Sequence, residues 1–249
     1  MGRGQTVVLV HGLGSNANHW LPVARDLARD HHVVLVELPG HGLAPLATPF
    51  GLEQATLALD RAIVEEASGP VVLVGHSVGG IVALTEALRA PGRVRALVLV
   101  ETALRPQLTS AERDSFLASL DRDWEGTLHE VYASFGRDST QGEALWAAAS
   151  QIERATLRAW VPVVLTTDLS LEARSLAVPV LAILAPHSWE RGETWERAAR
   201  VLGYSGIPRL EGERVEDCGH FLMLDQPEAL ARAIRRAASA TGESPIAMR

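Results

Sequence analysis

Short runs of β-branched and aliphatic residues alternate along the chain with longer amphipathic segments. Such runs, when bounded by glycine or polar residues, are typical of strands buried on both faces of a parallel sheet. Strands are predicted over residues 6–10, 33–36, 71–74, 97–100 and 180–184, and helices over residues 20–29, 52–67, 78–89, 195–202 and 227–240. The pattern predicts an α/β fold whose doubly wound, mostly parallel sheet is covered by helices on both faces.

One interval interrupts this alternation. From about residue 104 to residue 171 the composition is helical, with a single strand-like patch at residues 161–165. An insertion of this kind between two strands is typical of a lid or cap. We therefore expect a core formed by residues 1–103 and 172–249, with a mostly helical cap over residues 104–171. Residues 241–249 are expected to form a loose tail.

The sharpest local signal is the hexapeptide Gly75-His76-Ser77-Val78-Gly79-Gly80, which follows a predicted strand and precedes a predicted helix. Glycine neighbours let the strand turn abruptly into the helix and lift the serine side chain above the sheet edge. The helix amino terminus favours negative charge that develops nearby. A chance match to G-x-S-x-G is easy in a chain with 21 glycines. The strand before and the helix after argue against chance, so Ser77 is predicted to be a nucleophile.

Two further motifs supply what a serine nucleophile needs. The glycine-rich turn His11-Gly12-Leu13-Gly14 follows the first strand, and the amides of Leu13 and Val78 are the candidates for an oxyanion hole. His11 itself is expected to hold the turn. Near the carboxyl end, Asp217-Cys218-Gly219-His220-Phe221 lies on a loop before the last helix. A histidine titrates near neutral pH, so His220 is the predicted base that activates Ser77.

The composition excludes several classes of chemistry. All 23 basic residues in the Lys+Arg count are arginines, which excludes a phosphate-loop lysine, a Schiff base and a Ser/Lys dyad. The net charge of −7 gives no general affinity for nucleic acid or an anionic membrane. Cys218, the single cysteine, forms neither an internal disulfide nor a thiolate metal site, and we expect it to be a small filler rather than a nucleophile.

The expected partner is therefore a small-molecule substrate, with no cofactor and no metal. The scattered histidines show no metal-ligand spacing, and His187 is expected to lack a nearby partner. The segment 1–6 is too polar and too short for a signal peptide, and no stretch approaches the roughly 20 apolar residues of a membrane span. We expect a cytoplasmic protein.

Taken together, the motifs resemble those of the α/β-hydrolase superfamily of esterases, lipases and dehalogenases. The matching pieces, in the family's order, are His11-Gly12, Glu37-Leu38-Pro39-Gly40-His41-Gly42, the serine hexapeptide, and Gly219-His220-Phe221 followed by Pro227-Glu228. The resemblance implies the α/β-hydrolase fold, with residues 6–10 as the family's third strand. The first two strands of the family are then expected to be missing or reduced.

The sequence departs from the family at the catalytic acid. Most members carry an aspartate after the strand that follows the cap, where this chain reads Leu184-Ala185-Pro186-His187-Ser188-Trp189. Some dehalogenases and related luciferases carry the acid after the preceding strand, which here ends at Val100 and is followed by Glu101. By this resemblance Glu101 is the preferred acid, where it would orient the imidazole of the base. Glu190 on a shifted loop, Asp217, or no acid at all remain alternatives.

The few aromatic residues are concentrated where a substrate would bind. Half of the twelve lie in the cap interval: Phe116, Trp124, Tyr132, Phe135, Trp146 and Trp160. Most are expected to form the core of the cap. Trp124, Trp146, Trp160, Phe135 and the loop residue Trp189 are candidates to line an apolar substrate pocket.

The function predicted from these residues is a cofactor-free serine hydrolase that cleaves a small or medium apolar carboxylic ester through an acyl-enzyme. Haloalkane dehalogenation is disfavoured because it requires a carboxylate at position 77. A lactonase, an amidase or a carbon-carbon bond hydrolase would use the same residues. An alternative from a different functional class is a ligand-binding sensor that has this fold and retains the triad.

Overall fold

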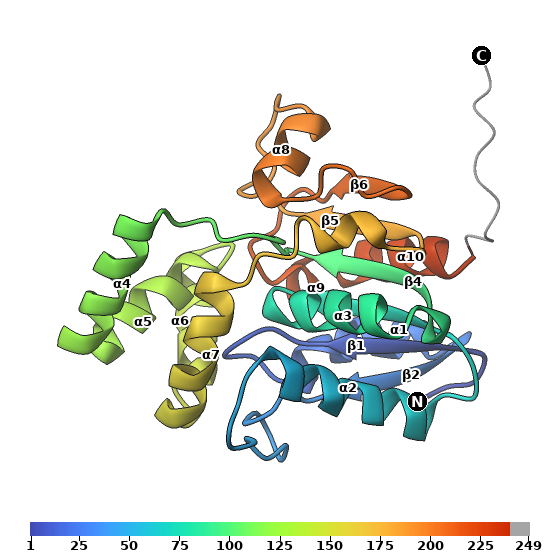
Figure 1. The fold of residues 1–249 in the computed structure, drawn as a ribbon, viewed down its shortest axis with the longest axis horizontal. Helices are drawn as coiled ribbons and strands as arrows, with labels where there is room; N and C mark the ends of the chain where they lie inside the picture. Colours follow the sequence, from blue (N-terminus) through green and yellow to red (C-terminus); the bar gives the residue numbers. More distant parts are fainter. Residues whose placement is uncertain (240–249) are drawn as a thin grey trace.

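The predicted parallel sheet is confirmed by a computed structural model that describes residues 1–239. Six strands, all parallel, are arranged in the order β2-β1-β3-β4-β5-β6 (Figure 1). They are β1 (Gln5–Val10), β2 (His31–Val36), β3 (Val71–His76), β4 (Val94–Val100), β5 (Val180–Leu184) and β6 (Leu210–Arg214). The chain reverses its direction of travel across the sheet between β2 and β3, as in doubly wound folds.

The edge strand β6 falls outside the strands predicted from apolar runs. Its sequence, Leu-Glu-Gly-Glu-Arg, is mostly polar, and none of its residues is fully buried. A strand at the edge of a sheet needs only one hydrogen-bonded neighbour, and β6 pairs with β5 alone. The apolar pattern that marks a central strand is therefore absent from it.

Helices cover both faces of the sheet, as predicted. One face packs against α2 (Leu52–Glu66), α3 (Val78–Arg89) and α8 (Trp195–Leu202), and the other against α1 (Leu21–Leu27), α9 (Leu222–Asp225) and α10 (Pro227–Ser239). Short 3₁₀ turns occur at η1 (Ala17–Trp20), η2 (Pro91–Arg93) and η3 (Glu172–Ser175). The side chains of the central strands alternate between the two faces and thus contribute to two separate apolar cores.

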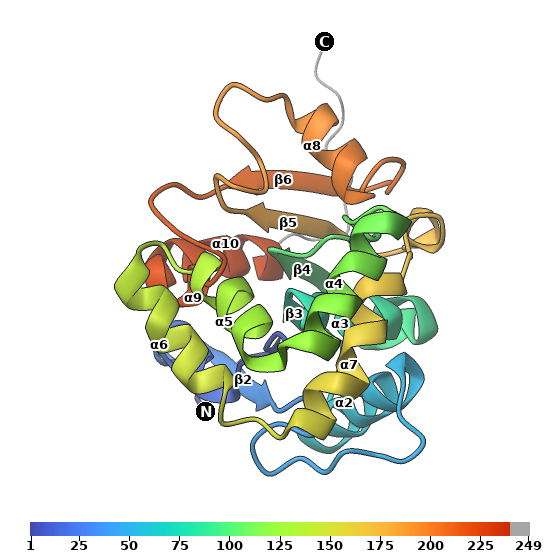
Figure 2. The ribbon, with the colours of Figure 1, turned by 90° about the vertical axis from the view of Figure 1, so that its left-hand side faces the viewer.

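Between β4 and β5 the chain forms four helices beside the carboxyl ends of the strands (Figures 1 and 2). These insert helices are α4 (Ser110–Arg122), α5 (Trp124–Ser134), α6 (Ser139–Ala149) and α7 (Arg154–Thr166). A small core of their own, which includes Leu120, Leu128 and Leu157, holds them together. The amino termini of α4, α5 and α6 are capped by the side chains of Thr109, Asp123 and Asp138, respectively.

The strand-like patch predicted at residues 161–165 is wrong, because it belongs to helix α7. A run of β-branched residues cannot be assigned to a strand or a helix by its apolar character alone. The buried positions Leu157, Trp160 and Val161 recur at helical spacing, which is what packs α7 against its neighbours. Pro162 lies inside the helix and removes one backbone donor from it.

Two predicted segments extend beyond the residues that the structure describes. The predicted tail at residues 241–249 lies outside the described residues, as does the last residue of the helix predicted over 227–240. Within residues 1–239, no helix combines the length and the apolar content needed to cross a membrane.

Candidate active site

Ser77 lies in the tight turn between β3 and α3, at the carboxyl edge of the sheet. Its backbone has φ 53° and ψ −126°, a left-handed conformation that is strained for a residue other than glycine. The turn is possible because a Cβ on Gly75 would collide with the backbone of Gly79 and Gly80. The Ser77 N–H donates to the carbonyl of Val100 on the neighbouring strand at 2.9 Å. The sequence thus builds the serine elbow that the glycine pattern predicted.

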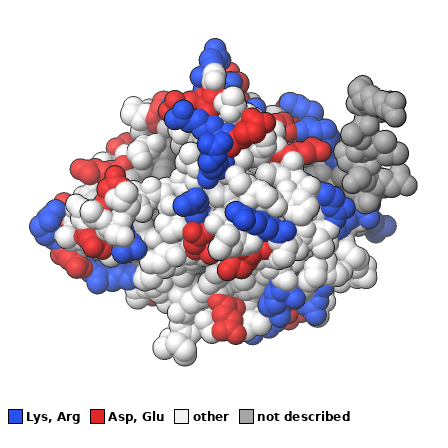
Figure 3. All heavy atoms as spheres, turned by 45° about the horizontal axis from the view of Figure 1, so that its top comes forward, with Lys and Arg blue, Asp and Glu red and all other residues white. Residues whose placement is uncertain are grey.

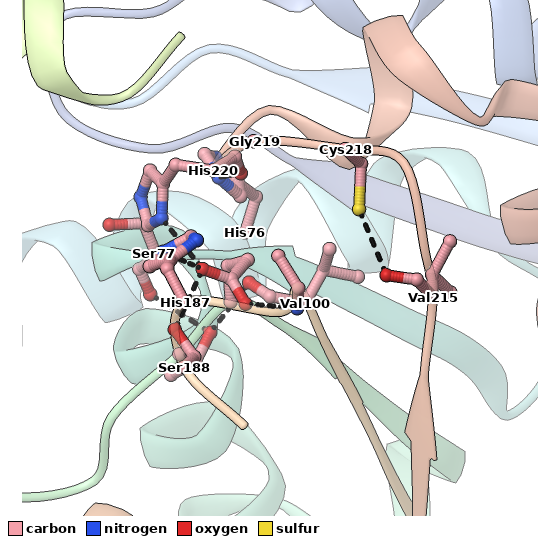
Figure 4. Close-up of polar contacts among 12 residues, drawn as sticks. His76, Ser77, Val100, His187, Ser188, Val215, Cys218, Gly219 and His220 are labelled. Atoms are coloured by element: carbon pink, nitrogen blue, oxygen red, sulfur yellow. Dashed lines mark hydrogen bonds and ion pairs between the residues drawn. The ribbon is translucent and has the colours of Figure 1, made fainter. Parts of the chain in front are cut away.

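Glu101 follows β4, the strand beside β3, and contacts the predicted base, His220, which is labelled in Figure 4. The His220 Nδ1 lies 3.0 Å from Glu101 Oε2, and because a carboxylate only accepts, Nδ1 carries the proton. The other carboxylate oxygen, Oε1, accepts the N–H of Ala185 at 2.6 Å. In the neutral imidazole this leaves Nε2 as the nitrogen with a free lone pair.

The environment of Glu101 keeps its carboxyl group ionised. Burial of this side chain, which is 1% exposed, by itself raises the pKa. Hydrogen bonds from His187 and His220 lower the pKa by more, so the pKa lies well below its usual range. A buried carboxylate that stays charged at neutral pH stabilises an imidazolium that forms beside it.

The other two acid candidates are placed elsewhere. Glu190 and Asp217 are both exposed, and neither makes a hydrogen bond or ion pair with His220 in the described structure. Asp217 has a positive φ of 56° at the start of the loop that carries His220. Of the three candidates, the geometry brings only Glu101 to the base.

A second histidine contacts the same carboxylate oxygen, which sequence reasoning did not foresee. The Nε2 of His187 lies 2.7 Å from Glu101 Oε2, and the hydroxyl of Ser188 donates to that oxygen at 3.0 Å. The expectation that His187 lacks a partner is wrong, because its partner comes from the end of β4, on the other side of the insert helices in the sequence. The hydrogen bond with Glu101 raises the pKa of His187. No local motif around His187 could have revealed this long-range pairing.

The candidate oxyanion hole lies beside the serine. A Cβ on Gly12 would come within 3.0 Å of the Ser77 Cβ, so the Gly12-Leu13 backbone passes directly against the elbow. Within residues 1–239 the N–H of Leu13 makes no backbone hydrogen bond. Val78 is the first residue of α3, so its N–H has no acceptor inside the helix. Both residues border the space next to Ser77, since each lines a cavity that Ser77 also lines.

Buried neighbours position the loop that carries His220. The Nε2 of His76 donates to the His220 carbonyl at 2.9 Å. Burial and the nearby His220 hold the pKa of His76 well below its usual value, so His76 stays neutral. The ring of Phe135 stacks on His220 with centroids 4.5 Å apart, and the Phe135 carbonyl accepts the His220 N–H at 3.0 Å. His220 is thus held from both the core and the insert helices.

Two cavities meet at Ser77 and His220. One, of about 520 Å³, lies between the segment after β4, the end of α7 and helix α8, and His187 and Arg105 line it. The other, of about 330 Å³, extends under the insert helices and is lined mainly by apolar side chains such as Leu13, Leu128 and Val161. Ser77 therefore borders one mostly apolar cavity and one cavity that also has polar groups.

The five residues predicted to bind substrate are separated by the structure. Phe135 lines both cavities. Trp124 and Trp146 border another cavity, and Trp124 receives the guanidinium groups of Arg154 and Arg158 on its ring.

The remaining two tryptophans also lie away from Ser77. Trp160 is fully buried and donates to the Pro39 carbonyl at 3.0 Å, while Trp189 packs on Trp195. None of these four tryptophans therefore lines either of the two cavities at Ser77. Indole rings have a large apolar surface, and here this surface is buried in the apolar cores or packs against the edges of those cores.

The fold and this site together define an α/β hydrolase. Residues 7–233 match the sequence profile of the alpha/beta hydrolase family, and the chain belongs to that family. It is 30% identical over 243 residues to a pimeloyl-[acyl-carrier protein] methyl ester esterase of Nitrosomonas europaea, with 91% of this chain and 93% of the relative covered. It is 25% identical to the esterase YbfF of Escherichia coli over 92% of this chain and 91% of that protein. Among solved structures, an esterase from Exiguobacterium antarcticum superposes with a TM-score of 0.81 at 19% identity, covering 96% of this chain and 94% of that one.

Proposed function

We propose that this protein is a serine hydrolase that cleaves carboxylic esters through an acyl-enzyme. The broader conclusion, a hydrolase acting on ester bonds, follows from the family match and from esterase-named relatives that align over most of the chain. The observation that carries the mechanism is the contact of the His220 Nδ1 with the buried Glu101 carboxylate, beside the strained Ser77.

The proposed reaction has two halves. Ser77 Oγ attacks the ester carbonyl carbon while His220 Nε2 takes the serine proton, and the amides of Leu13 and Val78 bind the oxyanion. The C–O bond to the alcohol then breaks, and His220 returns the proton to the departing oxygen. Water repeats the sequence on the acyl-enzyme, with His220 again as base, and releases the acid and free Ser77. Glu101 stays ionised throughout and stabilises the imidazolium.

The insert helices are proposed to act as the cap over the substrate. The apolar cavity of about 330 Å³ lies between Ser77 and helices α4, α5 and α7. An apolar acyl or alcohol group of small or medium size suits such a lining, since burial of its surface supplies the binding energy. Phe135 is the one predicted substrate-binding residue that the proposal retains. The expected partner remains a small molecule, and cytoplasmic localisation remains a prediction from the sequence.

The test is turnover of p-nitrophenyl esters in a chain-length series. We expect the wild type to hydrolyse short and medium chains and Ser77→Ala to lose at least about 10³-fold in kcat, because the attacking group is gone. Ser119→Ala, which removes an exposed serine hydroxyl on α4, is the matched control and should keep the wild-type rate. Equal background rates in wild type and Ser77→Ala would refute the hydrolase and favour a ligand-binding sensor. Turnover of lactones, amides or β-diketones but not of simple esters would instead place the activity in one of the related hydrolase classes.

A further inference from the structure

Three metal-ligating side chains converge beside the serine. Glu101, His187 and His220 each offer one ligand atom, and these atoms all lie within 4.8 Å of one another. Two imidazole nitrogens and a carboxylate oxygen are the donor set of open zinc sites in proteins. The proposed reaction accounts for Glu101 and His220, but it gives no role to His187.

The cluster has the support that a metal site needs. The Ala185 N–H and the Ser188 hydroxyl fix the two oxygens of the Glu101 carboxylate, as outer partners do for metal-binding carboxylates. The His187 side chain is 51% exposed and lines the cavity of about 520 Å³, which provides an entry path and an open coordination position. Bonds of about 2.0–2.1 Å in a tetrahedron set donor atoms about 3.3 Å apart. The present distances from Glu101 Oε2, 2.7 Å to His187 and 3.0 Å to His220, are both shorter than this, so small movements of both imidazole rings relative to the carboxylate are needed to admit the ion.

Other potential ligands in residues 1–239 are placed less favourably. The sulfur of Cys218 is directed at the Val215 carbonyl, 3.1 Å away, and is not part of the cluster (Figure 4). On the insert helices, His129 and Glu143 form an exposed pair with only two ligand groups. This pair is useful as a control because it has the same residue types as two members of the cluster.

We propose that Glu101, His187 and His220 form a binding site for a divalent transition-metal ion such as Zn²⁺, and that the bound ion blocks hydrolysis. The ion takes the place of the protons between Glu101 Oε2 and the two rings. A protonated His187 releases one proton to solvent, and its Nε2 lone pair binds the ion. On His220 the ring proton moves from Nδ1 to Nε2, and the Nδ1 lone pair binds the ion. With Nε2 protonated, His220 has no lone pair to accept the proton of Ser77.

Metal binding is tested on the untagged, full-length protein after removal of metals with a chelator. Co²⁺ is the probe because its visible absorption reports tetrahedral coordination, and Zn²⁺ should displace it. We expect one equivalent to bind to the wild type, to Ser77→Ala and to His129→Gln. His187→Gln removes one ligand and should weaken binding by roughly tenfold or more. Loss of a residue that only supports a ligand already has an effect of that size. Thermal melting of each variant verifies that it is folded.

Inhibition is measured in the wild type, His187→Gln and His129→Gln, each against its own metal-free rate. Zn²⁺ should inhibit ester hydrolysis by the wild type, EDTA should restore it, and His187→Gln should need roughly tenfold more Zn²⁺ or more for the same inhibition. Undiminished Co²⁺ binding in His187→Gln, or its loss in His129→Gln, would overturn the site, as would no binding at all. The inhibition rests on the proposed role of His220, whereas the binding does not. If Co²⁺ binds as expected while no ester is hydrolysed, the site stands and the proposed function fails.

Discussion

At the scale of single residues, strained backbone conformations position two side chains of the candidate site. Ser77 and Glu101 follow adjacent strands, and both have left-handed φ values, 53° and 48°. Such strain costs about 1–3 kcal/mol for each residue and persists only where the surroundings enforce it. Here the N–H of Ser77 donates to Val100 and the N–H of Glu101 donates to Ile183, both at 2.9 Å. The sheet therefore holds Ser77 and Glu101 at one edge.

The residue-scale prediction concerns Glu101→Gln. An amide keeps the shape of the side chain but removes the charge that fixes the His220 tautomer and stabilises the imidazolium. We expect kcat to fall by about 10³- to 10⁴-fold with little change in KM and with the fold retained. Steady-state kinetics and thermal melting check this. The matched variant Glu190→Gln should remain near the wild-type rate, and the reverse result would move the acid to the loop after β5.

At the scale of elements, the insert helices and the loop of His220 are fastened together by Asp225. Its side chain is 1% exposed, and its Oδ2 accepts the Gly219 N–H at 2.9 Å. Its Oδ1 accepts from the Gln141 side chain at 2.6 Å, and Arg137 lies 3.6 Å away. Both residues belong to the insert, so one carboxylate contacts both the loop of His220 and the insert. No sequence motif pointed to Asp225.

Asp225→Asn tests this coupling. The substituted amide cannot accept at every position that the carboxylate does, so it loses charge-assisted hydrogen bonds of about 1.5–3 kcal/mol each. If roughly 1.4 kcal/mol of this appears as misalignment of His220, kcat falls about tenfold. Steady-state kinetics should show this loss, and hydrogen exchange should show faster exchange in both the loop and α6. Asp121→Asn, which removes an exposed carboxylate paired with Arg158, is the control. Equal kinetics for the two variants would contradict the coupling.

At the scale of the whole molecule, most charged side chains lie at the surface, whereas several neutral histidines lie inside. On the face that Figure 3 shows, arginines and carboxylates are intermixed rather than gathered into a patch of one sign. Burial lowers the pKa of His19 and His76 and lowers that of His41 to about 4. An unfolded histidine has a pKa near 6.5, so unfolding below this pH takes up protons that the native protein excludes.

Stability is therefore expected to fall as the pH drops. The contribution of neutral His41 to the free energy of unfolding is fully present above pH 6.5. It is lost between pH 6.5 and about 4, at roughly 1 kcal/mol per pH unit. Urea unfolding between pH 7.5 and 4.5 measures the slope of the free energy of unfolding. His41→Gln should give a shallower slope, while His129→Gln, which changes an exposed histidine, should not. The same slope in wild type and His41→Gln would show that His41 is not the linked group.

The sequence by itself determined the class of fold and predicted part of the candidate site. Apolar runs predicted five of the six strands, because central strands buried on both faces carry an unbroken local signal. The glycines around Ser77 and the short motif around His220 are equally local, since each describes one turn of the backbone. These features needed no knowledge of what lies beside them.

Only the tertiary structure decided which distant residues meet. The choice among the acid candidates depends on which strands are neighbours, since β3 pairs with β4 and β4 with β5. This pairing brings Glu101 to His220 across 119 positions of sequence, and to His187 across the whole insert. The tryptophans illustrate the same limit, because their size predicts burial but not the cavity or core they border. Contacts across such separations are set by packing of the whole sheet and its insert, which leaves no local pattern to read.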